Sequence, residues 1–224
     1  MTPTRLPIVE KILGANDQMA DLNRQYLREK HIFTVNIMAS PGAGKTSVIL
    51  QTIKALSPEI KIGVIEGDTA PVTIDADKIS AAGMPAIQIN TGGDCHLDAP
   101  MVAEALKVFP LDGIDLLLIE NVGNLVCPAS FDLGQDANIL ISSVPEGDDK
   151  PYKYPAMYRG LQALVLNKID LLPYVPFKID YFNAGVLALN PGIQRFDVSC
   201  QTGEGIEQWA AWLRSQVLSA RNAG

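Results

Sequence analysis

The stretch "IFTVNIMASPGAGKTS", residues 32–47, joins an apolar run to a glycine-rich turn and the start of a helix. Glycines in such a turn let backbone N–H groups converge on an anion, and the helix N-terminus adds its positive dipole end. Lys45 would reach the terminal phosphates and the Thr46 hydroxyl would bind Mg²⁺. Ala39 stands where the usual motif begins with glycine. We predict a nucleotide-phosphate site here, with an ordinary glycine-rich turn as the alternative. The residues predicted to form the site are Gly42, Ala43, Gly44, Lys45, Thr46 and Ser47.

Strand-like and helix-like segments alternate on both sides of this motif. Strands are expected at 32–39, 60–67, 85–90, 114–121, 137–144, 161–168 and 193–200. Helices are expected from the glycine-rich turn to residue 56 and at 73–83, 95–109 and 204–219, with one or two more over 7–30, where Gly14 is a candidate break. This pattern predicts an α/β P-loop NTPase of three layers, a mostly parallel sheet flanked by helices. We expect one domain over residues 1–224, with 1–30 as an N-terminal helical extension.

Composition excludes several classes of protein. The net charge is −7 and no cluster of Lys and Arg stands out, which disfavours nucleic-acid binding. No apolar run approaches the roughly 20 residues that span a bilayer, and the N-terminus lacks the core of a signal peptide. We therefore expect a cytoplasmic protein that binds neither nucleic acid nor membrane. The three cysteines are an odd number without framework spacing, so reduced thiols or metal ligands are favoured over disulfides.

A guanine site is predicted where "LVLNKID", residues 164–170, ends a strand with Asn167, Lys168 and Asp170. A carboxylate accepts both adjacent donors on the guanine edge, whereas adenine presents an acceptor there. This tetrad therefore predicts GTP over ATP, with the Lys168 stem packed over the ring. Further on, "VSCQTGEGI", residues 198–206, resembles the guanine-backing loop of GTPases, which makes Cys200 a loop residue rather than a metal ligand. The triplet positions of that loop are held by Ser199, Cys200 and Gln201.

Carboxylates follow two other predicted strands. Asp68, Asp75 and Glu120 are our candidates for binding Mg²⁺, directly or through water. Asp75 and Asp77 could instead cap or solvate a helix start, which is the interpretation we favour for Asp77. No Gln or Arg stands out to orient a water, so slow intrinsic hydrolysis is expected. The Gly123 N–H could sense the γ-phosphate, and the expected catalytic set is Lys45, Thr46, Asp68, Asp75, Glu120 and Gly123.

A transition-metal site is predicted from two segments, "NTGGDCHLDA" (90–99) and "ENVGNLVCPASFDLG" (120–134). Cys95, His96 and Cys127 offer the thiolates and imidazole that select Zn²⁺ or Ni²⁺. Spacing alone leaves open a buried thiol beside a surface histidine. Three ligands leave a four-coordinate site incomplete, so water or a second chain would complete it. We expect the segment from Glu120 to Cys127 to couple the metal to the nucleotide.

From about residue 5 to 220 the chain resembles the HypB family, the hydrogenase nickel-incorporation GTPases. The motifs that carry the resemblance are "SPGAGKTS", "EGDTAPVTIDADKI", "NTGGDCHLDA", "ENVGNLVCPASFDLG", "EGDDKPYKYP" and "LNKIDLLPYV". The resemblance implies the signal-recognition and MinD-like branch of P-loop GTPases and a GTP-dependent homodimer. Cys95, His96 and Cys127 would match the family's Ni²⁺ or Zn²⁺ site.

The resemblance also implies partners. These are a small nickel- and zinc-binding accessory protein of the HypA type and, as client, the large subunit of a [NiFe]-hydrogenase. Lys150 or Lys153 would reach the partner chain's nucleotide, with a solvated loop as the alternative. Residues 1–30 hold neither the cysteine cluster nor the histidine-rich tract of some members, so we expect the minimal GTPase form.

Two other functions are kept as alternatives. The chain could be a GTP-dependent scaffold for a partner that carries the nickel. It could also be a related GTPase that serves urease or a cobalamin-dependent mutase. The urease nickel GTPases carry their cysteine and histidine in a Cys-Pro-His triplet, which this chain lacks.

Overall fold

The computed structural model describes residues 8–57, 59–70 and 72–223. Among these residues, seven strands form one sheet in the order β3-β2-β4-β1-β5-β6-β7, and every neighbouring pair is parallel. The prediction of a parallel α/β sheet is therefore confirmed. The strands are β1 (Phe33–Ala39), β2 (Ile62–Asp68), β3 (Ala86–Asn90), β4 (Leu116–Glu120), β5 (Ala137–Ser143), β6 (Ala163–Asn167) and β7 (Gln194–Asp197).

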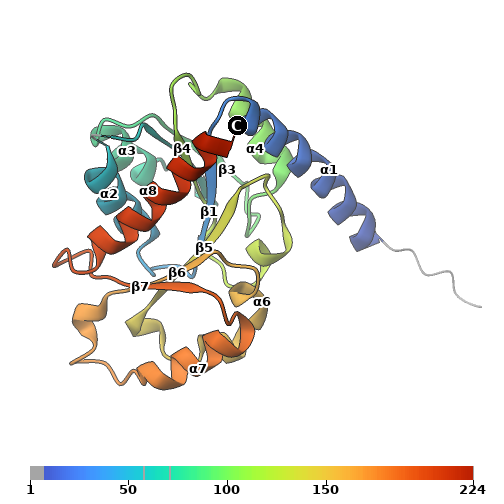
Figure 1. The fold of residues 1–224 in the computed structure, drawn as a ribbon. Helices are drawn as coiled ribbons and strands as arrows, with labels where there is room; N and C mark the ends of the chain where they lie inside the picture. Colours follow the sequence, from blue (N-terminus) through green and yellow to red (C-terminus); the bar gives the residue numbers. More distant parts are fainter. Residues whose placement is uncertain (1–7, 58, 71, 224) are drawn as a thin grey trace, which may run out of the picture.

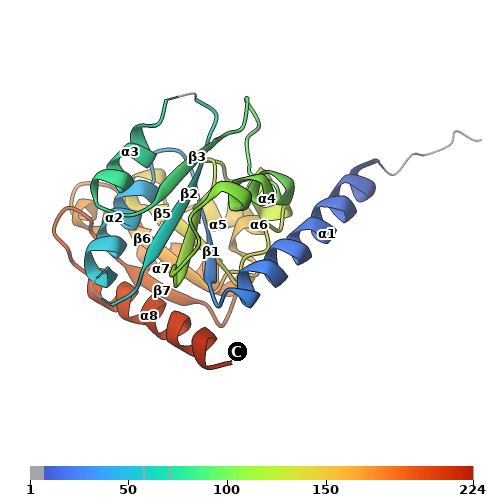
Figure 2. The ribbon, with the colours of Figure 1, turned by 90° about the horizontal axis from the view of Figure 1, so that it is seen from above.

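Helices cover both faces of the sheet (Figures 1 and 2). One face packs against α2 (Lys45–Leu56), α3 (Ile74–Ala81) and α8 (Ile206–Ala223). The opposite face packs against α1 (Ile8–Glu29) and α4 (Ala99–Val108), and farther along against α6 (Pro155–Tyr158) and α7 (Ile179–Leu189), while α5 (Lys150–Lys153) packs against α6 and α7. Central strands are buried on both sides, so they read as continuous apolar runs.

Three short 3₁₀ turns complete the described elements, at Cys127–Ser130, Val144–Glu146 and Ile169–Leu171. Each follows a strand at the carboxyl edge of the sheet, the edge where parallel α/β proteins bind their ligands. The described residues include no helix that is both long and apolar enough to span a membrane.

The helices differ from the sequence prediction in one boundary, the start of α4, and in three helices for which none was expected, α5, α6 and α7. Helix α1 runs through Gly14 without a break, so one helix stands where one or two were expected. Helix α4 begins at Ala99 rather than residue 95, because Asp98 caps it by accepting a hydrogen bond of 2.8 Å from the Met101 N–H. Cys95 and His96 consequently lie in the loop before the helix and not on it.

Candidate functional site

The phosphate loop connects β1 to α2. Gly44 has a φ of +100°, in the left-handed region, and a Cβ at this position would lie 2.5 Å from the Asn167 amide nitrogen. Any other residue would therefore be strained and would also push the guanine motif away. The loop and the first turn of α2 bring together all six residues predicted for phosphate binding.

The guanine motif is bonded directly to the phosphate loop. The Asn167 amide donates a hydrogen bond of 3.0 Å to the Ala43 carbonyl, and the Lys168 ammonium donates one of 2.6 Å to the Gly42 carbonyl. Lys168 itself has a φ of +62°, an uncommon backbone conformation that turns its side chain back over the loop. The segments predicted to bind the base and the phosphates are thus joined by two hydrogen bonds.

A cavity of about 670 Å³ lies between α2 and the two loops predicted to hold the base. Asp170 lines it, and its carboxylate accepts a hydrogen bond of 2.6 Å from the Ser199 hydroxyl. Cys200 lines it as well, and burial raises the pKa of its thiol to about 11, which keeps the thiol neutral. The cavity has the size of a ligand pocket. Its lining residues are Ser47, Leu50, Gln51, Asn167, Lys168, Asp170, Leu171, Cys200 and Gln201.

Two glutamates pair across the sheet beside the phosphate loop. Glu66 on β2 and Glu120 on β4 are register partners, and they are 4% and 3% exposed. Burial raises the pKa of each to about 7, and for Glu66 the neighbouring Glu120 raises it further. Glu120 accepts a hydrogen bond of 2.9 Å from the Thr46 hydroxyl. Sequence reasoning selected Glu120 but missed Glu66 as a site residue.

The second carboxylate oxygen of each glutamate is buried without a hydrogen-bond partner. An unpaired buried carboxylate oxygen is costly, and a hard cation such as Mg²⁺ takes such oxygens as ligands. The Thr46 hydroxyl and the Lys45 ammonium lie on the same side of the sheet, with Lys45 lining the same cavity as both glutamates. The donor set therefore fits Mg²⁺ beside a nucleotide phosphate.

The other predicted carboxylates line this cavity of about 250 Å³. Asp68 ends β2, and Asp75 forms an ion pair of 2.7 Å with Lys78 in the first turns of α3. Asp77 points elsewhere and accepts a hydrogen bond from the Thr73 hydroxyl, in agreement with a role at the helix start. Gly123 also lines the cavity, where an added Cβ would lie 3.3 Å from the Lys45 ammonium.

Cys95, His96 and Cys127 converge as predicted. Their ligand atoms all lie within 4.8 Å of one another. The two sulfurs are 2.8 Å apart, and the Cys95 sulfur is 3.9 Å from His96 Nδ1. All three cysteines of the chain are free thiols, and the contact with Cys95 raises the pKa of Cys127. Thiolates and an imidazole are ligand types that bind Zn²⁺ or Ni²⁺, and these three side chains gather at one place.

Side chains that sequence reasoning left unassigned hold this cluster in place. The His96 ring stacks on Phe131 with centroids 3.8 Å apart. Asn121, fully buried, accepts a hydrogen bond of 3.0 Å from the N–H of Leu97, the residue after His96. Asn124 accepts one of 3.2 Å from the Cys127 N–H, while its own N–H donates 2.8 Å to the carbonyl of Ala39. Asn124 thus touches both the metal segment and the start of the phosphate loop.

Lys150 and Lys153 lie in the short helix α5. Both form ion pairs with Asp149, at 3.4 Å for Lys150. The Lys153 side chain is 59% exposed, whereas that of Lys150 is 21% exposed. Of the two, Lys153 is the more available to another molecule.

Comparison with known proteins places these features in a family. A model described as "CobW/HypB/UreG, nucleotide-binding domain" matches residues 33–197. The hydrogenase maturation factor HypB of Escherichia coli K12 is 45% identical over 217 residues, which are 96% of this chain and 74% of that protein.

Two solved structures agree with the fold. HypB from Helicobacter pylori in complex with nickel aligns with a TM-score of 0.87 at 34% identity and covers 92% of this chain and 96% of that one. The signal recognition particle receptor FtsY from Elizabethkingia anophelis shares the fold alone, with a TM-score of 0.54 at 14% identity over 86% of this chain and 70% of that one. The chain therefore belongs to the CobW/HypB/UreG family of nucleotide-binding proteins and is a GTPase of the HypB hydrogenase maturation factors.

Proposed function

We propose that this chain uses GTP binding and hydrolysis to control the release of nickel, held by Cys95, His96 and Cys127, into a [NiFe]-hydrogenase. One observation carries the proposal. The segment from Glu120 to Cys127 begins at a glutamate bonded to Thr46 of the phosphate loop and ends at a metal-site thiol. The segment is eight residues long and its backbone is hydrogen-bonded to the phosphate loop. A change in the bound phosphate at one end can therefore alter the metal site at the other end.

The nucleotide half of the proposal assigns a role to each group. Lys45 and the loop N–H groups bind the phosphates, and Asp170 and Lys168 select the guanine. Thr46, Glu120, Asp68 and Asp75 would hold Mg²⁺, directly or through water, and the ion would neutralise charge on the phosphates. Gly123 stands against the phosphate loop, where its N–H can sense the γ-phosphate. Glu66, with its own unpaired buried oxygen, joins this set.

The metal half treats nickel as cargo. Thiolates and imidazole bind both Ni²⁺ and Zn²⁺, so zinc is a second occupant of the same site. Three ligands from one chain leave room for water or for a second chain in the coordination sphere. We propose a GTP-dependent homodimer in which Lys150 or Lys153 reaches the partner chain's nucleotide.

The HypB relationship supports a proposal for the remaining partners. We propose that a small nickel- and zinc-binding protein of the HypA type exchanges metal with this chain, and that the client is the large hydrogenase subunit. The cytoplasm is the proposed location. Neither nucleic acid nor membrane has a part in this function.

The test is a calorimetric titration of Ni²⁺ into the protein. We expect binding that is lost in Cys127→Ala and in His96→Asn. The chain has only two histidines, so His31→Asn is the matched control; His31 is exposed and has a φ of +57°, which asparagine tolerates. Equal nickel binding in the wild type, Cys127→Ala and His96→Asn would reject the proposed site.

A scaffold function is the second candidate. Among the described residues, those that line the cavity beside Lys45 include no glutamine or arginine to speed hydrolysis. A chain that hydrolyses GTP slowly could serve mainly as a GTP-bound dimer. Hydrogenase maturation in an extract supplied with a non-hydrolysable GTP analogue separates the two: full maturation supports the scaffold, and arrested nickel transfer supports control by hydrolysis.

A further inference from the structure

Helix α1 carries two buried asparagines that face the metal-binding loops. Asn16 and Asn23 are each 4% exposed, and they share one stripe of the helix with the buried Ala20 and Leu27. A helix that needed only to dock would present apolar residues along this stripe, because a buried amide is costly unless its hydrogen bonds are satisfied. Each amide makes two hydrogen bonds, and the partners show what the helix holds.

Each asparagine bonds to both ligand-bearing segments. Asn16 accepts a hydrogen bond of 2.9 Å from the Ala99 N–H and donates one of 2.8 Å to the Asp132 carbonyl. The Asn23 amide donates 2.9 Å to the Ala99 carbonyl and 3.1 Å to the Leu133 carbonyl. Ala99 follows His96 by three residues, and Asp132 follows Cys127 by five. The two side chains therefore bridge the segments that supply the metal ligands.

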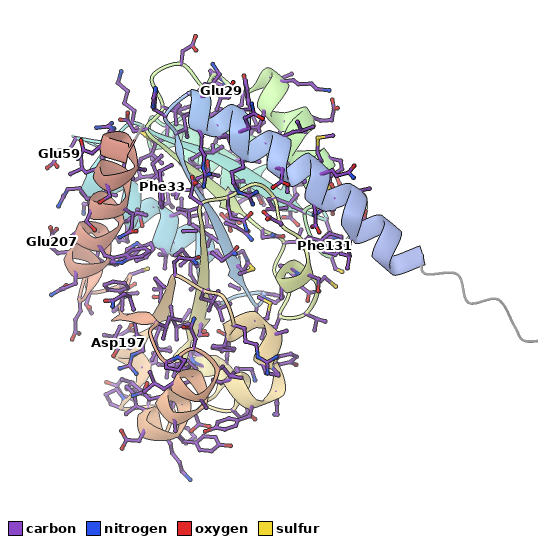
Figure 3. The ribbon with its side chains drawn as sticks, turned by 45° about the vertical axis from the view of Figure 1, so that its right-hand side comes forward. Glu29, Phe33, Glu59, Phe131, Asp197 and Glu207 are labelled. Carbon is purple, nitrogen blue, oxygen red and sulfur yellow. The ribbon has the colours of Figure 1, made fainter. Side chains whose placement is uncertain are left out.

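The segment that follows Cys127 lies directly against the backbone of α1. Gly134 has a φ of +94°, and an added Cβ would lie 2.6 Å from the Ala20 carbonyl oxygen. Arg24 adds an ion pair of 2.5 Å with Asp132. Figure 3 shows Phe131, which stacks on His96, on the loop beside α1. No other residue type at position 134 would allow so close an approach without strain.

We propose that Asn16 and Asn23 are positioning residues of the metal site. By bonding both segments at once, they fix the distance between the Cys95–His96 pair and Cys127. They touch no metal ligand, so they act through the backbone that carries the ligands. This inference rests on the proposed metal site, and it adds that nickel affinity depends on how α1 is docked.

Isosteric substitutions test the inference sharply. Asn23→Asp replaces the amide that donates to two carbonyls with a carboxylate that can donate to neither, whereas Asn16→Asp keeps the bond that it accepts from Ala99. Removing groups that orient metal ligands typically weakens metal binding by about 10-fold to 100-fold. We expect Asn23→Asp to fall in that range and Asn16→Asp to show a smaller effect.

The matched control is Gln25→Glu, an amide-to-carboxylate change on the exposed face of the same helix. Ni²⁺ affinity and the thiolate-to-nickel charge-transfer absorption are measured for each variant at a temperature where circular dichroism shows it folded, together with GDP affinity. The expected result is weakened nickel binding and altered absorption in the two asparagine variants, with GDP affinity unchanged and Gln25→Glu like the wild type.

Cys127→Ala, measured in parallel, separates this inference from the function on which it rests. If Cys127→Ala abolishes nickel binding while both asparagine variants bind nickel like the wild type, with only a lower melting temperature, α1 is merely structural and the inference fails. The inference also fails if GDP and nickel affinities drop together. If Cys127→Ala itself binds nickel normally, the proposed metal site fails. Should Asn23→Asp not fold, the smaller loss expected of Asn16→Asp decides the question.

Discussion

Glu66→Gln should change how the stability of the nucleotide-free protein depends on pH. Glu66 and Glu120 are buried register partners whose pKa values rise from 4.5 to about 7. Below pH 4.5 each carboxyl is protonated in both the folded and unfolded states. Between pH 4.5 and 7 the unfolded chain ionises first, so stability falls as pH rises. A shift from 4.5 to about 7 corresponds to about 3 kcal/mol per group above pH 7.

Glutamine keeps the shape of the side chain and removes the ionisable group. The stability gained by Glu66→Gln over the wild type should therefore grow by about 2 to 3 kcal/mol between pH 5 and pH 8. The assay is urea unfolding in EDTA without nucleotide, at several pH values across this range. Glu104→Gln on the exposed face of α4 is the control, because its only described ion pair is with Lys107 at the surface.

Parallel stability curves for Glu66→Gln and the wild type would refute the reasoning. With Mg²⁺ and GTP present, Glu66→Gln should be less stable than the wild type instead of more stable. The substitution removes one of the carboxylates proposed to face the ion. A variant that is more stable empty and weaker in binding is the signature of a functional carboxylate. A variant that binds Mg²⁺ and GTP like the wild type would remove Glu66 from the proposed site.

Three further substitutions test separate parts of the molecule. Asp170→Asn should weaken GTP binding by about 100-fold or more, because the carboxylate that pairs with both guanine donors is lost; unchanged affinity in a fluorescent-nucleotide titration would contradict the base assignment. Lys45→Ala should leave the fold intact by circular dichroism but abolish GTP hydrolysis, and retained turnover would remove Lys45 from the phosphate site. Gly134→Ala should destabilise the protein by about 2 kcal/mol, because the added Cβ strains a left-handed backbone and meets α1. This loss lowers the melting temperature by about 4 to 8 °C, and an unchanged melting temperature would mean that α1 is not held as described.

Much of the fold could be predicted because each central strand is a short apolar run followed by a glycine or polar break. The missed helix α7 and the start of α4 were the clearest errors. The sequence contains Asp98 followed by Pro100, a strong helix-start signal that agrees with a start at Ala99, four residues later than expected. This boundary matters for function, because it places Cys95 and His96 in the loop that leads into α4.

The contiguous motifs of the candidate site could be recognised in the sequence, whereas Glu66 was missed because its place depends on strand order. The phosphate and guanine motifs are short sequences with known spacing. Glu66 becomes a partner of Glu120 only because β2 lies beside β4, which no local pattern reveals. Asn16 and Asn23 did leave a signal, since two amides seven residues apart interrupt the apolar stripe of α1. Their hydrogen-bond partners lie on loops far away in the sequence, so the role of the two amides could not be predicted.

Reciprocal coupling is the central claim, and one set of titrations tests it directly. Nickel affinity is measured with GDP and with a non-hydrolysable GTP analogue, and the affinity for each nucleotide is measured with and without nickel. If the segment from Glu120 to Cys127 links the sites, the two nickel affinities differ, and the nucleotide affinities shift by the same factor. Nickel affinity that is identical in both nucleotide states would contradict the account, because the phosphate site and the metal site would then be independent.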